Sequence, residues 1–328
     1  MSRKTRWGIL GTGNIARQFA TGLAAVEGAE LAAVGSRKQE TADAFGRQFA
    51  IPRRHASYEA LVADASIDVI YVSTPHHLHK PNTLMALQAG KAVLCEKPFC
   101  LNAREAEEVI SYARSNNLFL MEAMWSRFLP VTVEVQRWLA EGAIGDVRMV
   151  TADFGFRADF NPEARLFNLA YGGGGLMDVG IYVISLASMV FGGPPTQMTS
   201  LADIGQSGVD EQAAFVFGYD AGRLASLTCA VRTTTPQEAT IIGTEGRIHL
   251  PSRFWNAKTA VLTVAGKEPV CIEPPRTGNG YNYEADEVQR CLSEGLTESA
   301  LMPLDETVSV LRTMDALRAQ WGVKYPGE

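Results

Sequence analysis

The sequence predicts an α/β protein with two domains, a doubly wound parallel sheet at the N-terminus and an α+β domain with a large, open, mainly antiparallel sheet after it. Three observations carry this prediction. Apolar segments of strand length alternate with helical patterns up to about residue 124, a glycine-rich turn follows the first apolar segment, and strand-like segments succeed one another after residue 147. We therefore expect one domain over residues 1–124 and a second over residues 125–328.

Composition limits the class of partner. The 328 residues are 46% hydrophobic and carry a net charge of −6 without a basic run, which argues against nucleic acid and anionic membranes and favours a small molecule. Five cysteines without Cys-x-x-Cys spacing fit free thiols in the cytoplasm. No segment has the pattern of an export signal or a membrane span, because Gly11 and Arg17 interrupt the first apolar stretch and Asp178 interrupts the most apolar later one.

The first element is a strand over residues 7–10, followed by a turn and a helix. The turn has the Gly-x-Gly-x-x-Ala pattern of a Rossmann dinucleotide site. Gly11 permits the tight turn, Gly13 lets a pyrophosphate approach the backbone, and Ala16 lets helix and strand pack closely. Because the pattern directly follows an apolar strand, we expect it to bind a cofactor. The contacts that we expect here are Gly11, Thr12, Gly13, Asn14 and Ile15.

A second strand over residues 30–34 ends in a basic turn. Sites that prefer NAD usually carry an acidic residue here for the ribose 2′-hydroxyl, and this sequence has none. Ser36 can donate a hydrogen bond to a 2′-phosphate and Arg37 can cover it with a permanently charged planar group, so the turn favours NADP over NAD. The alternative is a basic turn exposed to water.

A third strand over residues 68–72 ends in a segment with three histidines. The carboxyl end of such a strand faces the ligand in a doubly wound sheet, so we expect Thr74, Pro75, His76 and His79 to contact cofactor or substrate. A metal site is disfavoured because no carboxylate or cysteine accompanies the histidines locally. Helices are expected near residues 39–49, 58–63 and 80–89.

Lys97 stands at the end of the next apolar strand, over residues 91–95. Glu96, Lys97 and Pro98 follow that strand at the edge where α/β sheets bind ligands. The two charged residues are either a solvated ion pair or part of an active site, and their own segment does not decide between the two. The first domain then closes with a helix over residues 102–116 and a strand over residues 118–121.

The second domain begins with a helix over residues 130–141 and a long strand over residues 147–156. Strand-like segments between residues 196 and 273 predict a mainly antiparallel sheet. Such a sheet needs one face covered, and a second copy of the chain could supply the cover, so we expect a homodimer or a higher homo-oligomer. Two helices, over residues 281–292 and 304–321, follow the sheet.

Asp178 and Tyr182 lie four residues apart after a run of glycines, which places both on one face of a helix. A tyrosine hydroxyl can relay a proton when a nearby cation lowers its pKa, and an aspartate beside it can orient a substrate hydroxyl. The alternative, which the spacing alone favours, is a helix cap at Asp178 and a core aromatic at Tyr182.

The ordered set of motifs resembles the glucose-fructose oxidoreductase and inositol dehydrogenase (Gfo/Idh/MocA) superfamily over essentially the whole chain. The set consists of the glycine turn, Glu96-Lys97-Pro98, and the run of glycines leading to Asp178-x-Gly-x-Tyr182. The segment Glu-Ala-Met-Trp-Ser-Arg-Phe at residues 122–128, and a tyrosine where most relatives carry histidine, resemble the branch of dimeric dihydrodiol dehydrogenase and NADP-dependent D-xylose dehydrogenase.

The resemblance implies roles for single residues. Lys97 matches the catalytic lysine, Asp178 the acid that orients the substrate, and Tyr182 the general acid and base. It also implies that the bond between Lys97 and Pro98 is cis. Further cofactor contacts that it implies are His76, His79, Glu96, Lys97 and Arg165. The aromatic substrate contacts that it implies are Trp125, Phe154 and Trp255.

Together these residues imply hydride transfer between a nicotinamide and the hydroxyl or carbonyl carbon of a sugar or cyclic trans-diol, in either direction. Two alternatives remain. One is a cofactor-sensing regulator without catalysis, against which the complete set of Lys97, Asp178 and Tyr182 argues. The other is an oxidoreductase of the same fold that acts on an inositol or an anhydrosugar. A pocket with aromatic walls and polar groups suits a sugar ring and a cyclic diol alike, and we expect a pyranose on grounds of context alone.

Overall fold

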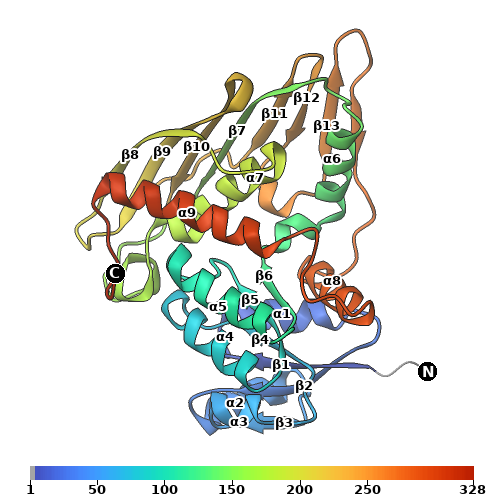
Figure 1. Ribbon diagram of the computed structural model, residues 1–328, viewed down its shortest axis with the longest axis vertical. Coiled ribbons are helices and arrows are strands. Elements are labelled where there is room, and N and C mark those ends of the chain that lie inside the picture. The colour runs from blue at the N-terminus through green and yellow to red at the C-terminus, as the bar shows by residue number, and fades with distance from the viewer. Residues whose placement is uncertain (1–3) are drawn as a thin grey trace. The chain divides into compact units, whose positions relative to one another are not determined.

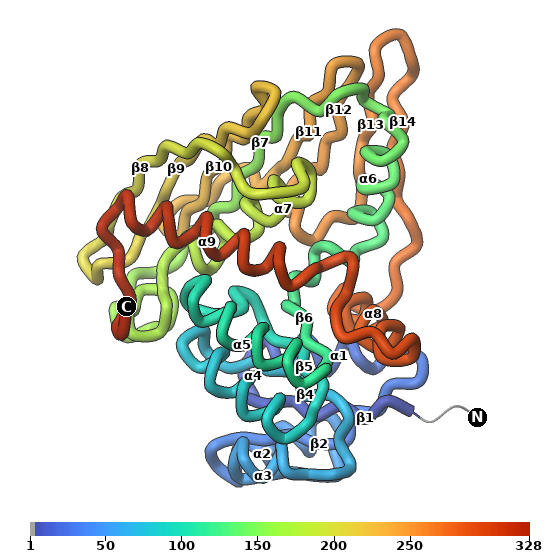
Figure 2. The backbone as a smooth tube through the Cα atoms, in the orientation of Figure 1, coloured from blue at the N-terminus to red at the C-terminus, as the bar shows by residue number. Residues whose placement is uncertain are grey.

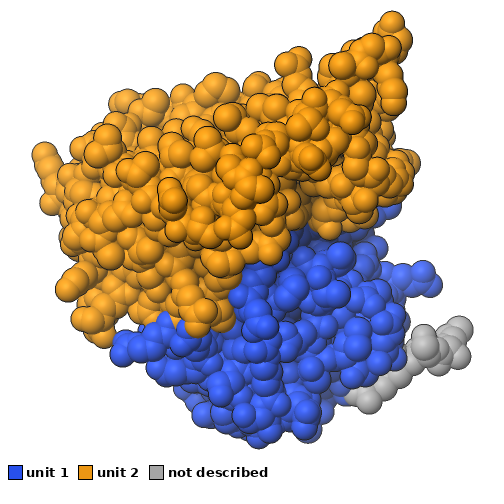
Figure 3. Space-filling view, turned by 45° about the horizontal axis from the view of Figure 1, so that its top comes forward, with its two compact units in different colours: residues 1–100, 104–128, 277–307 blue, residues 101–103, 129–276, 308–328 orange. Residues whose placement is uncertain are grey.

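The computed structural model describes residues 4–328, which fold into two compact units, each built from separate segments of the chain. Unit 1 comprises Met1–Cys100, Arg104–Phe128 and Thr277–Thr307, and unit 2 comprises Leu101–Ala103, Leu129–Arg276 and Val308–Glu328. Figure 3 shows the two units in blue and orange. The division expected from the sequence follows the chain at residue 124, whereas unit 1 also includes a segment from much later in the chain.

Unit 1 is built on a six-stranded sheet in the order β3-β2-β1-β4-β5-β6. The strands are β1 (Thr5–Leu10), β2 (Ala29–Gly35), β3 (Arg53–His55), β4 (Val69–Val72), β5 (Ala92–Glu96) and β6 (Leu120–Ala123). Every pairing in this sheet is parallel, which confirms the doubly wound fold. All residues of β4 and β6 are buried, and strands buried on both faces read as the continuous apolar runs seen in the sequence.

Helices and short turns connect these strands (Figure 1). They are α1 (Asn14–Leu23), α2 (Gln39–Gln48), α3 (Tyr58–Val62), a 3₁₀ turn (His76–Leu78), α4 (His79–Gln88), α5 (Ala103–Ser115) and a second 3₁₀ turn (Trp125–Phe128). The strand order reverses between β1 and β4, so the loops after these two strands flank the crevice in which such sheets bind ligands.

A segment from the last third of the chain completes unit 1. Its helix α8 (Asn282–Ser293) packs against α1 and the turn over residues 125–128. The Asn279 side-chain amide donates a 2.8 Å hydrogen bond to the Gln18 carbonyl, and the Leu120 amide of β6 donates one of 3.1 Å to the Thr297 carbonyl. Gly22 permits this approach, because a Cβ there would lie 2.6 Å from the Asn279 carbonyl oxygen.

Unit 2 is built on an eight-stranded sheet in the order β14-β13-β12-β11-β7-β10-β9-β8. The strands are β7 (Val147–Gly155), β8 (Gln197–Ile204), β9 (Asp210–Tyr219), β10 (Arg223–Ala230), β11 (Ala239–Gly243), β12 (Gly246–Leu250), β13 (Ala260–Val264) and β14 (Val270–Ile272). All neighbours are antiparallel except β7 and β10, which confirms the mainly antiparallel sheet predicted from the sequence.

Helix α7 (Ile181–Phe191) lies on one face of this sheet, where it contacts β7 and β10, and Figures 1 and 2 show it in front of the strands. Trp321, at the end of α9 (Leu304–Trp321), donates a 2.8 Å hydrogen bond to the Ser200 hydroxyl of β8, and α6 (Pro130–Ala140) precedes β7 in the chain. In β9, Phe215 and Phe217 are buried while Val216 between them is 41% exposed, as expected for a sheet covered on one face. The helical run Leu169–Phe191 is long and apolar enough for a membrane span, but 83% of its most apolar stretch is buried inside the protein, as in a core helix.

Candidate active site

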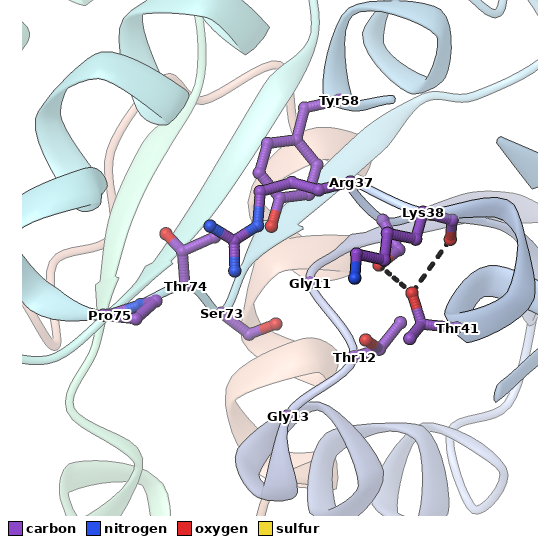
Figure 4. A pocket seen from close by; sticks show the side chains of 11 residues that line it. Gly11, Thr12, Gly13, Arg37, Lys38, Thr41, Tyr58, Ser73, Thr74 and Pro75 are labelled. Atoms are coloured by element: carbon purple, nitrogen blue, oxygen red, sulfur yellow. Dashed lines mark hydrogen bonds between the residues drawn. The ribbon is translucent and has the colours of Figure 1, made fainter. Parts of the chain in front are cut away.

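A cavity of about 610 Å³ opens in unit 1 at the carboxyl ends of β1, β2 and β4 (Figure 4). The residues of its lining that the sequence predicts as cofactor contacts are Gly11, Thr12, Gly13, Ser36, Arg37, Thr74 and Pro75. The lining also contains Lys38, Thr41, Tyr58 and Ser73, which no local pattern marks as ligand contacts. The sequence therefore predicts the glycine turn and the basic turn of this cavity, whereas its remaining wall depends on the fold.

The glycine turn is shaped for a ligand with a phosphate backbone. Gly11 has φ +111°, and a Cβ there would lie 3.0 Å from the Ser73 hydroxyl, so only glycine fits without strain. A Cβ at Gly13 would meet no protein atom within 4 Å, so this backbone is open to a close approach. Asn14 and Ile15 form the start of α1 directly after Gly13, where the amide groups of a helix N-terminus favour an anion.

The far end of the cavity is basic and rich in hydroxyl groups. The Ser36 and Thr41 hydroxyl oxygens are 2.5 Å apart, and Thr41 also donates a 2.9 Å hydrogen bond to the Lys38 carbonyl. Arg37 lies alongside Tyr58 (Figure 4). Burial and the positive charge of Arg37 lower the pKa of His77, so that this imidazole is neutral at pH 7. These donors together suit a phosphate group.

Lys97 follows β5 in unit 1, and a buried side chain fixes the turn on which Lys97 lies. Its amide donates a 3.1 Å hydrogen bond to the Glu96 side chain, which is only 4% exposed. The other carboxylate oxygen of Glu96 accepts a hydrogen bond from the buried Tyr71 hydroxyl. The Lys97–Pro98 bond is cis, as the resemblance implies. Glu96 thus lies in the interior of unit 1 as a support of the Lys97 turn.

Two more buried side chains hold the same turn. His79 lies with Nδ1 2.7 Å from the Pro98 carbonyl oxygen and Nε2 2.7 Å from the Thr74 carbonyl oxygen, which ties the turn to the cavity wall. Glu122 accepts a 3.1 Å hydrogen bond from the Phe99 amide, and burial raises its pKa to about 7. The backbone groups around Lys97 are therefore fixed one after another by side chains from three different elements.

His76 and His79 are expected to contact the cofactor, but their surroundings differ from those of a residue that lines the cavity. Both are buried, and their rings meet edge to face with centroids 5.7 Å apart. His79 bridges two backbone carbonyls, and neither histidine belongs to the cavity lining.

Within residues 4–328 no three His, Cys, Asp or Glu side chains come together in a group that could hold a metal ion.

Asp178 and Tyr182 lie in unit 2, where the run of glycines leads into a π-helical turn (Leu176–Gly180) and then into α7. The π turn is a feature that the sequence does not predict, and such turns are frequent at functional sites. Arg165, in a 3₁₀ turn (Arg165–Phe167), pairs with Asp178 at 2.6 Å between Nη2 and Oδ1. The structure therefore places Arg165 at the candidate substrate-orienting acid.

An aromatic cluster accompanies Tyr182 in unit 2. Phe154 of β7 stacks on Trp255, with ring centroids 3.4 Å apart and planes at 11°. The Tyr182 ring lies 5.5 Å from Phe154 and 6.5 Å from Trp255. Trp125, the remaining predicted aromatic contact, belongs to unit 1 and stacks there on Tyr281 at 4.7 Å, a partner that the sequence does not indicate.

Comparisons with known proteins agree with this arrangement. Residues 5–124 match the oxidoreductase family with an NAD-binding Rossmann fold, GFO_IDH_MocA, and residues 132–249 match a GFO/IDH/MocA C-terminal domain. Trans-1,2-dihydrobenzene-1,2-diol dehydrogenase of Mus musculus is 38% identical over 332 residues, with 98% of each chain covered. The Xenopus tropicalis protein of that name is 39% identical over 332 residues, with 98% of this chain and 99% of the relative covered.

A solved structure extends the likeness to three dimensions. The crystal structure of aldose-aldose oxidoreductase from Caulobacter crescentus superimposes with a TM-score of 0.89 at 28% identity and covers 98% of each chain. Sequence, fold and motif order thus agree over both units. The chain belongs to the GFO/IDH/MocA family of oxidoreductases, as the order of its motifs predicts.

Proposed function

We propose that the protein is an NADP-dependent dehydrogenase that acts on the CH–OH group of a cyclic vicinal diol or a sugar. The observation that carries the proposal is the cavity of unit 1, which joins an open glycine backbone at Gly13 to a basic end at Arg37. The relatives named as dihydrodiol dehydrogenases support a cyclic diol, and the aldose-aldose oxidoreductase supports a sugar.

The cavity fits NADP better than NAD. Its lining contains no acidic side chain to accept a hydrogen bond from a ribose 2′-hydroxyl. Ser36, Arg37 and Lys38 instead offer hydroxyl, guanidinium and ammonium donors to a 2′-phosphate. When bound, the nicotinamide supplies the acceptor or donor of the hydride.

We assign the proton transfer to Tyr182. In the oxidative direction its oxygen takes the proton of the reacting hydroxyl, and in the reductive direction it returns that proton. To Lys97, which the family resemblance marks as the catalytic lysine, we assign the positive charge that favours this proton transfer. Asp178 accepts a hydrogen bond from the neighbouring hydroxyl of the substrate, while Arg165 at 2.6 Å holds the Asp178 carboxylate in place.

The aromatic cluster supports a ring-shaped substrate. The stacked rings of Phe154 and Trp255 form a flat apolar surface next to Tyr182. Such a surface suits the face of an unsaturated carbocycle and the apolar face of a pyranose. A carboxylate beside it at Asp178 adds selection for a second hydroxyl group.

A substrate panel tests the proposal. Reduced nicotinamide is followed by absorbance with a trans-dihydrodiol, aldoses, inositols and an anhydrosugar, each with NADP and with NAD. We expect turnover of ring diols with NADP, and a loss of about 100-fold or more in kcat for Tyr182→Phe with unchanged NADP affinity. Tyr171→Phe, a tyrosine that is 39% exposed in the same unit, is the matched control and should keep its kcat.

The double variant Lys97→Met/Tyr182→Phe extends this test. If both residues act on one proton transfer, the double variant should lose little more activity than the worse single variant. Near-normal turnover of Tyr182→Phe would contradict the role of Tyr182. Tight NADP binding without turnover of any substrate would favour the alternative, a cofactor-sensing regulator of the same fold.

We further propose that the protein works as a homo-oligomer in a reducing compartment such as the cytoplasm. The uncovered face of the sheet in unit 2 carries apolar side chains, among them Leu201 at 82% exposure and Val216 and Leu224 at 41% each. A second copy that covers this face would remove those side chains from water. All five cysteines are unpaired and four of them are buried, which suits a reducing environment.

A further inference from the structure

Glu284 is a buried carboxyl group that the proposed chemistry does not use. It lies in the first turn of α8 in unit 1 and has no exposed surface. Neither of its carboxylate oxygens has a hydrogen-bond partner among residues 4–328. An ionised carboxylate in this place would be both desolvated and unpaired, which is strongly unfavourable. A neutral, protonated side chain that donates a hydrogen bond to a neighbour removes the difficulty.

Glu96 is the neighbour that can accept a hydrogen bond from the protonated Glu284. Burial and the negative charge of Glu96 raise the pKa of Glu284 well above its ordinary value. Glu96 already accepts hydrogen bonds from the Tyr71 hydroxyl and the Lys97 amide. A carboxylate has about four lone-pair positions, so Glu96 can accept a further hydrogen bond from Glu284.

The other ionisable groups near α8 do not neutralise Glu284. Arg17 of α1 and Arg127 of the turn over residues 125–128 lie on the two elements packed against α8, and both are engaged with other side chains. Burial raises the pKa of the Tyr71 and Tyr281 hydroxyls, so both are uncharged at neutral pH. The arginines of the two elements packed against α8 are therefore engaged elsewhere, and the negative charge of Glu96 acts on Glu284.

We propose that Glu284 carries a proton at neutral pH and donates a hydrogen bond to Glu96, so that the two carboxyl groups share a single negative charge behind Lys97. Both are positioning residues, because Glu96 anchors the Lys97 amide and Glu284 keeps Glu96 in place. Loss of the shared proton sets two like charges against each other in the interior and loosens the Lys97 turn. The effect on turnover rests on the proposed function of Lys97, whereas the presence of the proton does not.

Unfolding at several pH values tests whether Glu284 is protonated, without any assay of activity. Glu284→Gln keeps the shape of the side chain and a permanent donor, and it removes the titration. A carboxyl group whose pKa is raised on folding loses its stabilising contribution as pH rises through the folded value. We therefore expect the urea midpoint of the wild type to fall, relative to that of Glu284→Gln, as pH rises from 6 to 9.

Glu287→Gln is the matched control on the same helix. Glu287 is also buried, at 7% exposure, but its carboxylate accepts a 2.8 Å hydrogen bond from Arg290 and one of 2.5 Å from Ser299. Although burial opposes them, these bonds hold the pKa of Glu287 below its ordinary value. We expect this variant to be less stable than the wild type by an amount that does not change between pH 6 and 9.

Infrared spectroscopy detects the proton directly. The difference spectrum between wild type and Glu284→Gln at pH 7 should contain the C=O stretching band of a protonated carboxyl group, and the corresponding spectrum for Glu287→Gln should contain the bands of a carboxylate. A carboxylate difference for Glu284→Gln would overturn the proposal. So would a Glu284→Gln protein that fails to fold, because the amide preserves both shape and donor.

Activity then tests the positioning role. Glu284→Leu fills similar volume without a donor, and we expect it to lose about 10-fold in kcat while Glu284→Gln restores the wild-type value at pH 7. Over the pH range in which the unfolding data show Glu284 losing its proton, the ratio of kcat for Glu284→Gln to kcat for the wild type should rise, with the same KM for NADP. Equal kcat for the Leu and Gln variants would overturn the positioning role. If no substrate is turned over at all, the proposed function fails, while the unfolding data and infrared spectra still show whether Glu284 carries a proton.

Discussion

The Asp210 carboxylate accepts a 2.6 Å hydrogen bond from the Leu176 amide, and it thereby caps the helical run that carries Asp178 and Tyr182. Asp210 begins β9 and is fully buried. Burial raises its pKa to about 7, while the Leu176 amide and the charge of Arg318 favour the ionised form. The sequence suggests Asp178 itself as the cap of this helix, whereas in the structure the cap is Asp210, which lies on strand β9.

Asp210→Asn should change how stability depends on pH. The pKa of Asp210 rises from an ordinary value of 3.8 to about 7 on folding. Its contribution to stability is then fully present below pH 3.8 and is lost as pH rises through about 7. We expect urea unfolding to show the wild type losing stability relative to Asp210→Asn between pH 5 and 8. A stability difference between wild type and Asp210→Asn that stays constant over this range would mean that Asp210 is ionised throughout.

Gly174→Ala should disturb the same cap from the other side. Gly174 has φ +116°, and a Cβ there would lie 2.2 Å from Oδ1 of Asp210. We expect a loss of more than about 1 kcal/mol in the free energy of unfolding and a lower kcat, because the start of the helical run must shift. Gly193→Ala is the matched control, since a Cβ at Gly193 meets nothing within 4 Å. Equal unfolding midpoints for the two variants would refute the close packing at Gly174.

Arg37→Ala should weaken the binding of NADP much more than the binding of NAD. Arg37 lines the basic end of the cavity, and a charged hydrogen bond to a phosphate is worth about 1.5–3 kcal/mol. We expect KM for NADP to rise about 10- to 100-fold and KM for NAD to change little. Arg47→Ala removes the same charge from the exposed last turn of α2 and serves as the control. Equal increases for both cofactors would show that Arg37 does not contact the 2′-phosphate.

Val216→Glu should weaken the proposed oligomer. Val216 lies on the uncovered face of the sheet, and a carboxylate there would be buried without a partner if a second copy covers that face. Light scattering should show a smaller species for Val216→Glu than for the wild type at equal concentration. Val133→Glu, which alters a residue of α6 that is 46% exposed, is the control. A wild type that is monomeric at micromolar concentration would contradict the oligomer outright.

Much of unit 1 is predictable from the sequence for a physical reason. The strands in the middle of a doubly wound sheet are buried on both faces, so they appear as apolar runs bounded by turns, and the glycine turn is required by backbone conformation at Gly11. Strand β3 escapes such reasoning, because its sequence Arg-Arg-His has no apolar pattern. Its place in the sheet follows only from pairing with β2.

The parts of the site that sequence reasoning misses depend on contacts between distant segments. Asp210 and Glu284 belong to no sequence motif. Each acts through a residue from a distant segment of the chain: Asp210 through Leu176 and Glu284 through Glu96. The π-helical turn is equally hidden, since residues four apart share a face in either kind of helix. Motifs locate the groups that react, whereas the residues that hold those groups are found only in three dimensions.

The late segment of unit 1 has a consequence for synthesis on the ribosome. Strand β6 is translated well before its partner, because the acceptor of the Leu120 amide is Thr297. Helix α1 likewise lacks its hydrogen bond from Asn279 until that residue has been translated. A nascent chain that ends at residue 124 therefore presents an unpaired sheet edge and an uncovered helix face. Nucleotide binding is accordingly a property that the polypeptide acquires only after residues 279–297 have been translated, and a fragment cut at residue 124 should not reproduce it.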